Sequence, residues 1–442
     1  MALVSSGEPR PIRVGLLGLG NVGAALVELI GAQREAIRDR TGLDLVVTRV
    51  AVRSAAKARA VEVDPALLTT DASEVVTDPD IDIVVELIGG IEPARELTLA
   101  ALNAGKPVVT GNKELVANHA VELFTAAEAN GVDLLFEAAV AGAIPIMRPL
   151  RESLIGEPIA RVMGIVNGTT NYILSAMSED GASYADALAE AQSRGFAERD
   201  PTADVEGFDA AAKAAIIATI AFGQSVVAGD VYREGISSIT ASDIAAAERF
   251  DMVVKLLAIT ESTPDDSGET RINARVHPAM VPSDHPLASV RGSFNAVFIE
   301  GEALDDLMLY GRGAGGTPTA SAVLGDLIDA AGNASRNTAA VFGTMERARL
   351  SSIDDVRSAF YLTLDLIDQA GVLAAVAEIF GRHQVSIRSM EQAAPASPDG
   401  GAHVVFITHA TAESGLTAVL DELGRSEVVA SVGTVMRVIG VD

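Results

Sequence analysis

The 442-residue sequence has no cysteine and no tryptophan, and aromatic residues make up only 4% of it. Without cysteine, the chain forms no disulfide, no thiolate metal site and no cysteine nucleophile, so we expect a reducing, cytoplasmic setting. Basic residues are also scarce: 33 lysines and arginines stand against 60 acidic residues, which gives a formal net charge of -27. So acidic a chain is poorly suited to nucleic acid or an anionic membrane surface, and we expect neither partner.

Long apolar runs are missing as well. The opening segment "MALVSSGEPRPIR" has no apolar core of the length that a signal peptide needs. The most apolar stretch, residues 210–229, is interrupted by Lys213, Gln224 and two glycines, whereas a bilayer span needs roughly twenty apolar residues. We therefore predict no membrane segment, and a chain long enough for two or three domains.

The first third of the sequence alternates between strand and helix patterns. Strands are predicted at "IRVGLLGLG", "LVVTRVAVRS", "IDIVVELIG", "KPVVTGNK" and "GVDLLFEAAVAG", with helical segments between them. Repeated βαβ units indicate a parallel sheet that carries helices on both faces. We therefore expect residues 1–142 to form an α/β nucleotide-binding domain of the Rossmann type.

The rest of the chain predicts two further units. Residues 143–336 mix strands such as "RVMGIVNG" and "RINARVHPAM" with Ala-rich helices, which favours an α+β substrate domain, and "ESTPDDSGETR" is interpreted as a loop. A helix at 317–332 is expected to pack back on the first domain. After a polar linker at 337–357, residues 358–442 follow the order βαββαβ, which predicts a ferredoxin-like sandwich.

A glycine motif follows the first predicted strand. In "GLGNVG", the residues Gly18, Gly20 and Gly23 give the pattern G-x-G-x-x-G at the head of a helix, which is typical of a loop that binds a dinucleotide pyrophosphate. The second strand ends in "AVRSAAKAR" and lacks the acidic residue of an NAD site. Arg53 and Lys57 favour a 2′-phosphate and hence NADP(H), although a solvated basic helix start, and NAD(H), stay open alternatives.

One lysine stands in an otherwise apolar helix. If residues 208–221 are helical, Asp209 and Lys213 lie at positions i and i+4 and share a face. A surface ion pair is the plain alternative, but Ala214 to Ile220 offers no polar face for one. Burial weakens the preference of a lysine for its charged form. We therefore interpret Lys213 as a group that donates and accepts a proton in catalysis.

Three other segments hold candidate site residues. Lys113, in "TGNKELVANH", follows a strand and is expected at the carboxyl edge of the sheet, near substrate or nicotinamide, with a surface lysine as the alternative. Glu198 and Asp204 precede the lysine helix and suit a cationic amino group. In "EAAVAGAIP", free carbonyls and Glu137 suit a hard cation such as Na⁺, whereas no His or Cys cluster suits a transition metal.

These motifs together resemble the homoserine dehydrogenase family. The segments "GLGNVG", "GNKELVANH", "EAAVAGAIPI", "GIVNGTTNYIL", "GFAERDPTADVEGFDAAAKAA" and "YGRGAGGTPTASAV" follow the order and spacing of that family over roughly the first 340 residues. The C-terminal unit resembles an ACT domain, a ferredoxin-like module that senses amino acids. The resemblance implies reversible NAD(P)H-dependent reduction of L-aspartate 4-semialdehyde to L-homoserine, on the route to threonine and methionine. It also implies dimerisation through the middle domain, in a homodimer or homotetramer.

The resemblance also implies a role for each candidate residue. Lys213 is the catalytic proton donor, with Lys113 and Asp209 in support; Glu198 binds the amino end of the substrate and Asp204 assists. The remaining positions are the cofactor contacts Asn21, Val22, Arg53, Lys113 and Gly315, the sodium loop Glu137, Val140, Gly142 and Ile144, and the ACT turn Asp368, Gln369 and Gly371. Threonine inhibition through that turn is expected; dimerisation without a ligand is the alternative. Phe196, where tyrosine is common, and Arg199 depart from the family pattern.

Two rival interpretations fit the sequence less well. Another Rossmann dehydrogenase that acts on amino acids, such as an aspartate dehydrogenase, lacks the segment "DPTADVEGFDAAAK". A non-catalytic amino-acid sensor with a degenerate enzyme body is expected to have lost Lys113, Glu198 or Lys213, and all three are present.

Overall fold

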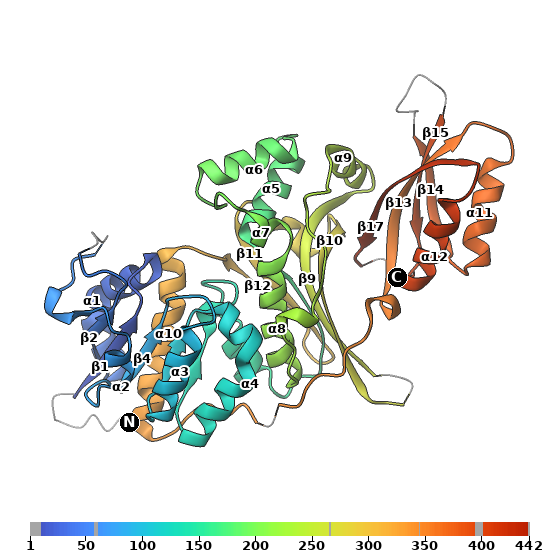
Figure 1. The fold of residues 1–442 in the computed structure, drawn as a ribbon. Helices are drawn as coiled ribbons and strands as arrows, with labels where there is room; N and C mark the ends of the chain where they lie inside the picture. Colours follow the sequence, from blue (N-terminus) through green and yellow to red (C-terminus); the bar gives the residue numbers. More distant parts are fainter. Residues whose placement is uncertain (1–9, 57–60, 265–266, 344, 394–400, 441–442) are drawn as a thin grey trace.

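The computed structural model describes residues 10–56, 61–264, 267–343, 345–393 and 401–440. Figure 1 shows three parts side by side: an N-terminal α/β part, a middle part around α8, and a C-terminal part in orange and red. Among the described helices, none is both long and apolar enough to cross a membrane.

The N-terminal part is a parallel sheet of six strands in the order β3-β2-β1-β4-β5-β6. The strands are β1 (Pro11–Leu17), β2 (Asp44–Ala51), β3 (Leu68–Thr69), β4 (Ile83–Glu86), β5 (Val108–Thr110) and β6 (Leu134–Leu135). The helices are α1 (Asn21–Thr41), α2 (Ser73–Thr77), α3 (Ala94–Asn103) and α4 (Lys113–Asn130). The order reverses between β1 and β4, so a ligand crevice is expected at the carboxyl ends of these two strands.

A late helix, α10 (Gly316–Arg336), packs on the N-terminal sheet. Its buried residues Ala320, Val323 and Leu327 share one apolar cluster with Leu16 and Leu26. The chain therefore leaves the first sheet, builds the middle part and returns to complete the first core.

The middle part is built on β7 (Ile159–Ile165), β9 (Met252–Pro264), β10 (Thr270–Pro282), β11 (Phe294–Gly301) and β12 (Asp305–Arg312). These strands pair in the order β12-β11-β7-β9-β10, and the short β8 (Tyr232–Arg233) pairs with β10. Its helices are α5 (Gly168–Glu179), α6 (Tyr184–Ser193), α7 (Thr202–Val205), α8 (Phe208–Phe222) and α9 (Ala241–Arg249).

The segment "ESTPDDSGETR" was expected to be a loop, and this expectation was wrong for most of its length. Strand β9 continues to Pro264 and β10 begins at Thr270, so most of this segment lies in a hairpin. Antiparallel pairing uses main-chain groups, and polar side chains do not prevent it. The ion pair between Arg275 and Glu261, 2.7 Å apart, adds a link across the two strands.

The C-terminal part has the predicted order βαββαβ. Its elements are β13 (Arg357–Ile367), α11 (Val372–Arg382), β14 (Ile387–Ala393), β15 (Gly401–Thr408), the short β16 (Thr411–Ala412), α12 (Glu413–Leu423) and β17 (Val429–Val438). The strands pair in the order β17-β13-β15-β14. Both helices supply residues to a core with Phe360, Leu362 and Phe406, as a ferredoxin-like sandwich requires.

The sheets of the middle and C-terminal parts are joined. Strands β10 and β17 pair in parallel at Ala279–Arg437 and Met280–Val438. The Arg437 side chain, 4% exposed, forms ion pairs with Glu413 of α12 at 2.5 Å and with Glu234 at 2.9 Å. The C-terminal part is therefore fixed to the middle part by two backbone pairs, a buried arginine and an apolar cluster that includes Tyr361, Ile407 and Met436.

Candidate active site

The single lysine of α8 is buried, as its apolar neighbours predict. Gly207, with φ of +79°, begins the helix in the left-handed region that favours glycine. Lys213 is 9% exposed, and its Nζ donates to Asp209 Oδ2 at 2.7 Å and to the carbonyl oxygen of Val166 at 2.6 Å. The predicted i,i+4 pair exists, and it lies inside the protein.

Asp209 holds a second lysine as well. Its Oδ1 lies 2.9 Å from the Nζ of Lys113, the first residue of α4, directly beyond the carboxyl end of β5. Burial alone raises the pKa of Asp209, but Lys213 and Lys113 together lower it well below its ordinary value. The charge of Asp209 in turn raises the pKa of Lys113. One carboxylate therefore draws ammonium groups from two parts of the protein together.

Asn167 is a site residue that the sequence analysis missed. Its Nδ2 donates to Asp204 Oδ1 at 2.7 Å and to Asp209 Oδ2 at 2.8 Å, so it bridges the two acids. Its Oδ1 accepts from the main-chain N–H of Thr170 and thereby caps α5. Burial raises the pKa of Asp204. The detectable signal was an asparagine directly before a helix, which is a capping pattern.

Glu198 lies apart from this cluster. It is exposed on the loop between α6 and α7, and its carboxylate makes no hydrogen bond or ion pair with the described residues. Thr169 Oγ1 donates to the carbonyl oxygen of Phe196 at 2.7 Å and holds the loop against α5. Glu198 is therefore an uncommitted carboxylate on a loop that is anchored to α5.

The glycine loop has the shape that a dinucleotide site needs. Gly18 has φ of +99°, and a Cβ there would lie 2.8 Å from the carbonyl oxygen of Leu87. A Cβ on Gly23 would lie 2.4 Å from the carbonyl oxygen of Gly18. Gly20 caps α1 without a side-chain hydrogen bond, and the first turn holds no acidic residue. The N–H groups of that turn are therefore open to an anion.

Two other cofactor candidates lie at the same edge of the sheet. Gly315 caps α10, and a Cβ on the next residue, Gly316, would lie 3.1 Å from the carbonyl oxygen of Asn21. The start of α10 is thus packed against the start of α1, where Val22 also lies. Arg53 is exposed just beyond the end of β2, while Lys57 lies outside the described residues.

Comparison with known proteins agrees with this geometry. A homoserine dehydrogenase from Corynebacterium glutamicum is 49% identical over 432 residues, which cover 98% of this chain and 96% of that protein. The chain belongs to the homoserine dehydrogenase family. Residues 18–137 match the family model "Homoserine dehydrogenase, NAD binding domain", residues 145–328 match "Homoserine dehydrogenase", and residues 360–427 match "ACT domain". The protein is therefore an NAD(P)-binding oxidoreductase with an ACT domain.

Solved structures of the homoserine dehydrogenase family share this fold. The enzyme from Thiobacillus denitrificans superposes with a TM-score of 0.90 at 41% identity, over 97% of this chain and 98% of that one. A hyperthermophilic archaeal homoserine dehydrogenase mutant, described as a complex with NADPH, has a TM-score of 0.60 at 30% identity. It covers 73% of this chain and 98% of its own.

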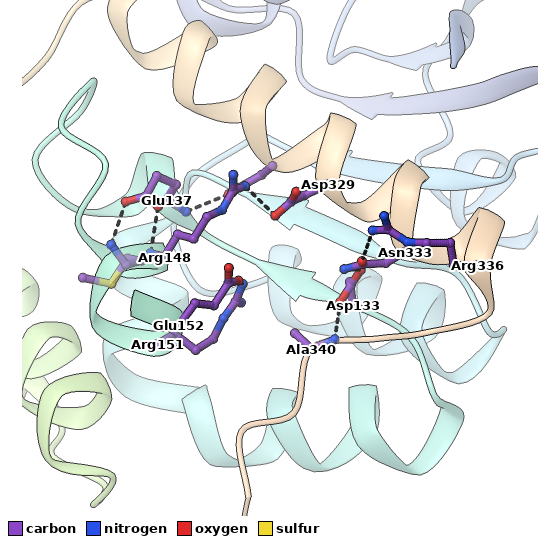
Figure 2. A network of polar contacts seen from close by, with 11 residues as sticks. Asp133, Glu137, Arg148, Arg151, Glu152, Asp329, Asn333, Arg336 and Ala340 are labelled. Carbon is purple, nitrogen blue, oxygen red and sulfur yellow. Dashed lines mark hydrogen bonds and ion pairs between the residues drawn. The ribbon is translucent and has the colours of Figure 1, made fainter. Parts of the chain in front are cut away.

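In this homoserine dehydrogenase, the loop expected to hold a cation is a structured turn. The Glu137 carboxylate accepts hydrogen bonds from the main-chain N–H groups of Ile146, Met147 and Arg148, at 2.5, 2.7 and 2.9 Å (Figure 2). Its oxygens therefore stabilise the turn. In contrast, no described residue donates a hydrogen bond to the main-chain carbonyls of the buried residues Val140, Gly142 and Ile144.

Those carbonyls fit a hard cation. Unpaired buried carbonyl oxygens are unusual in proteins, and oxygen ligands suit such ions. The Gly142 turn is packed tightly, since a Cβ there would lie 2.3 Å from the carbonyl oxygen of Gly313. The described residues hold no cluster of three His, Cys, Asp or Glu for another metal.

A partly buried ionic network ties this turn to α10. Asp326 Oδ2 accepts from the main-chain N–H of Glu137 at 2.8 Å, and Arg148 pairs with Asp329 at 2.6 Å. Figure 2 shows Asp329 and Asn333 extending from α10 toward Arg148 and Asp133. Burial raises the pKa of Asp326 to about 7. The helix that completes the nucleotide-binding core is thus also attached to the turn.

The candidate residues of the ACT domain share one exposed turn. Asp368 and Gln369 follow β13, and Gly371, with φ of +94°, caps α11. The turn lies at the surface, where a ligand or a second copy of the chain has access to it.

Proposed function

We propose that this homoserine dehydrogenase catalyses the reversible reduction of L-aspartate 4-semialdehyde to L-homoserine. The observation that carries the proposal is the buried Asp209 carboxylate, which holds Lys113 of the nucleotide-binding part and Lys213 of the substrate part. A carbonyl group that becomes an alkoxide needs a proton donor at that boundary.

When bound, the nicotinamide supplies the hydride that adds to the aldehyde carbon. The Lys213 ammonium has three N–H donors, of which Asp209 and the Val166 carbonyl take two. The third is left to donate to the developing oxygen anion. In the reverse direction, the neutral amine accepts the proton again. Lys113, held by the same carboxylate, adds positive charge beside that oxygen.

The substrate also has an ammonium and a carboxylate end. Glu198 has a carboxylate without a partner among the described residues, and it suits the ammonium group. Asp204 supports the site through the Asn167 amide, which links it to Asp209. This arrangement favours an amino-acid aldehyde over a plain one.

We propose NADP(H) as the preferred cofactor and NAD(H) as the weaker one. Arg53 is exposed just beyond β2 and suits a 2′-phosphate, and the archaeal relative is described with NADPH. The Arg53→Ala variant is expected to raise KM for NADPH about tenfold, with KM for NADH unchanged. Equal changes for both cofactors would contradict the assignment of Arg53 to the 2′-phosphate.

Three further features belong to this proposal. The carbonyls of Val140, Gly142 and Ile144 bind Na⁺, with Glu137 holding the loop. The ACT turn at Asp368, Gln369 and Gly371 binds threonine as a feedback inhibitor. The enzyme works in the cytoplasm as a homodimer or homotetramer, on the route to threonine and methionine.

The decisive experiment is an assay of semialdehyde reduction. Purified protein is incubated with L-aspartate 4-semialdehyde and either NADPH or NADH, with and without threonine and Na⁺, and cofactor oxidation is followed. Turnover with NADPH that yields homoserine is the expected result. No turnover with either cofactor would refute the proposed reaction.

A further inference from the structure

A buried carboxylate ends β4, where the strand order of the first sheet reverses. Glu86 is the last residue of this strand and is 0% exposed. Its Oε1 accepts from the main-chain N–H groups of Ile88 and Gly89 at 2.8 and 3.2 Å. Its Oε2 accepts from Thr110 Oγ1 at 2.6 Å. Ligands of such sheets bind at this edge, so the carboxylate is enclosed at the proposed cofactor site.

The hydrogen bonds of Glu86 continue into a closed ring. Thr110 Oγ1, at the end of β5, accepts from the main-chain N–H of Asn112 at 3.0 Å. Asn112 Nδ2 donates to the carbonyl oxygen of Gly90 at 2.6 Å, which leads back to the loop that Glu86 holds. We call the β4–β5 ring the set Glu86, Thr110, Asn112 and residues 87–90. Its three polar side chains belong to residues that are at most 5% exposed.

The β4–β5 ring contacts both halves of the proposed site. On one side, a Cβ on Gly18 would lie 2.8 Å from the carbonyl oxygen of Leu87, so the ring borders the glycine loop. On the other side, Asn112 Oδ1 accepts from the N–H of Leu115 at 3.1 Å and caps α4, whose first residue is Lys113. The ring therefore lies between the proposed pyrophosphate loop and a lysine of the proposed substrate site.

The ring contains a charge that a purely structural contact does not need. All three donors to Glu86 are neutral, and no basic side chain of the described residues pairs with it. Burying a carboxylate without a cation is costly, and a neutral side chain can also hold a turn. Both oxygens of an ionised carboxylate only accept, whereas glutamine presents a donor on one side. The carboxylate therefore fixes the direction of every donor that contacts it.

We propose that Glu86 is a positioning residue that holds loop 87–90 and the first turn of α4 in one fixed arrangement. Because Glu86 is enclosed, it acts through that loop on the cofactor and through Asn112 on Lys113. Groups held in place in advance lower the barrier, because they need not reorient during the reaction. The effect on kcat rests on the proposed function, whereas the effect on cofactor affinity rests only on the glycine loop.

Glu86→Gln tests the proposal in the full-length protein. The amide nitrogen of glutamine must face either the two N–H groups of loop 87–90 or the Thr110 hydroxyl, so one side of the ring opens. We expect Kd for NADPH, measured by fluorescence titration, to rise about fivefold or more. At saturating NADPH, kcat should fall about tenfold or more with KM for the semialdehyde within about threefold.

Asp133→Asn is the matched control. Asp133 is 1% exposed, and its carboxylate accepts from two neutral donors, the Ala340 N–H at 2.6 Å and Asn333 Nδ2 at 2.9 Å (Figure 2). It directly precedes β6, at the amino edge of the same parallel sheet and thus away from the crevice. This variant should lose thermal stability as Glu86→Gln does, with Kd and kcat within about twofold of the wild type. Equal kinetic effects of the two variants overturn the proposal.

A second pair of variants decides the proposal if Glu86→Gln does not fold. Thr110→Val keeps the shape of the side chain but removes the hydroxyl that joins Glu86 to Asn112, whereas Thr110→Ser keeps the hydroxyl. The valine variant should bind NADPH more weakly and turn over more slowly, and the serine variant should retain both properties. Wild-type constants in Thr110→Val, or equal losses in both variants, overturn the proposal.

Lys113→Ala separates the two routes by which Glu86 acts. Because turnover depends on Glu86 through Lys113, adding Glu86→Gln to Lys113→Ala should lower kcat little further, while cofactor affinity still weakens. Losses in kcat that multiply fully overturn the route through Lys113. Failure of the wild type to reduce the semialdehyde would refute the proposed reaction, and cofactor titration of the variants would still decide the role of Glu86.

Discussion

Single residues decide where protons move in this protein, and Lys213 is the main case. Replacing Lys213 by alanine removes the ammonium group that contacts both Asp209 and the Val166 carbonyl. We expect kcat for semialdehyde reduction to fall at least about 10²-fold with a much smaller change in KM, because the proton is needed in the transition state. Steady-state kinetics at neutral pH measure both constants.

Lys106 offers the matched control. It is also buried and also donates to a main-chain carbonyl, that of Asp78, but it lies in the nucleotide-binding part away from Asp209. The Lys106→Ala variant should keep kcat within a few-fold. Full turnover in Lys213→Ala would refute the proton-donor role.

Asp326 gives a prediction about pH. Its pKa is about 7 in the folded protein because it is buried, against about 3.9 in an unfolded chain. A raised carboxyl pKa contributes stability that is complete below the unfolded value and is lost as pH rises through about 7. Between about pH 4 and pH 7, the wild type should therefore lose up to about 1.4 kcal/mol of unfolding free energy per pH unit relative to Asp326→Asn.

Denaturant unfolding of both proteins at several pH values measures this difference. Asparagine keeps an oxygen that accepts from the Glu137 N–H, so the variant isolates the charge. Parallel pH curves for the two proteins would show that Asp326 does not titrate in this range.

The sequence predicted the contact between Asp209 and Lys213, but not the contacts that Asn167 and Glu137 make. Asp209 and Lys213 are neighbours on one helix, so helical spacing was enough to join them. Asn167 reaches Asp209 from a distant segment, and no local pattern reports such a contact. The whole of Glu137 was assigned to the cation loop, but its carboxylate oxygens accept hydrogen bonds from three main-chain N–H groups. The directions of N–H groups in an irregular turn cannot be predicted from the sequence.

At the scale of elements, the turn from β1 into α1 is defined by close contacts. An alanine at Gly23 would place its Cβ 2.4 Å from the carbonyl oxygen of Gly18, so the loop must move. We expect Gly23→Ala to raise Kd for NADPH about tenfold or more, since the first-turn N–H groups lose their alignment. Fluorescence titration of the cofactor measures this change.

The same helix supplies its own control. Gly31 lies in α1, and a Cβ there would meet nothing within 4 Å. Gly31→Ala should leave cofactor affinity unchanged and stabilise the protein by about 1 kcal/mol, because alanine favours the helix. A loss of affinity in both variants would contradict the contact argument.

Elements were predictable where an apolar period marked them. Five of the six strands of the first sheet and helix α8 were found from such patterns, whereas the two-residue strand β3 was not predicted. The polar end of the β9–β10 hairpin was predicted to be a loop, because it carries no apolar alternation. There main-chain pairing continues without such alternation, from Thr270 opposite Pro264 onward.

At the scale of the whole molecule, the union of the two sheets was not predictable. The C-terminal strands already pair with one another in a complete βαββαβ unit, so the order of elements does not indicate a further strand partner. Strand β10 joins β17 through only two residue pairs, and the buried Arg437 and apolar residues such as Tyr361 and Met436 pack against the middle part. A contact this short, between segments far apart in the chain, leaves no periodic signal.

Arg437 is expected to hold that joint. Burial raises the pKa of Glu413, and the arginine offsets this effect. Replacing Arg437 by leucine leaves Glu413 and Glu234 facing each other without their cation, and we expect a loss of about 3 kcal/mol of unfolding free energy. The loss should shrink at acidic pH, because Glu413 then binds a proton. Denaturant unfolding at neutral and acidic pH measures both effects.

Arg382, an exposed arginine that pairs with Glu378 and Glu422 on the surface of the ACT domain, is the control. Its replacement by leucine should cost less than about 1 kcal/mol, as for other exposed ion pairs. A second variant, Arg437→Leu with Glu413→Leu, should recover part of the loss, because it removes the stranded carboxylate. An equal effect of Arg437→Leu and Arg382→Leu would mean that β10 and β17 hold the domains together without the arginine.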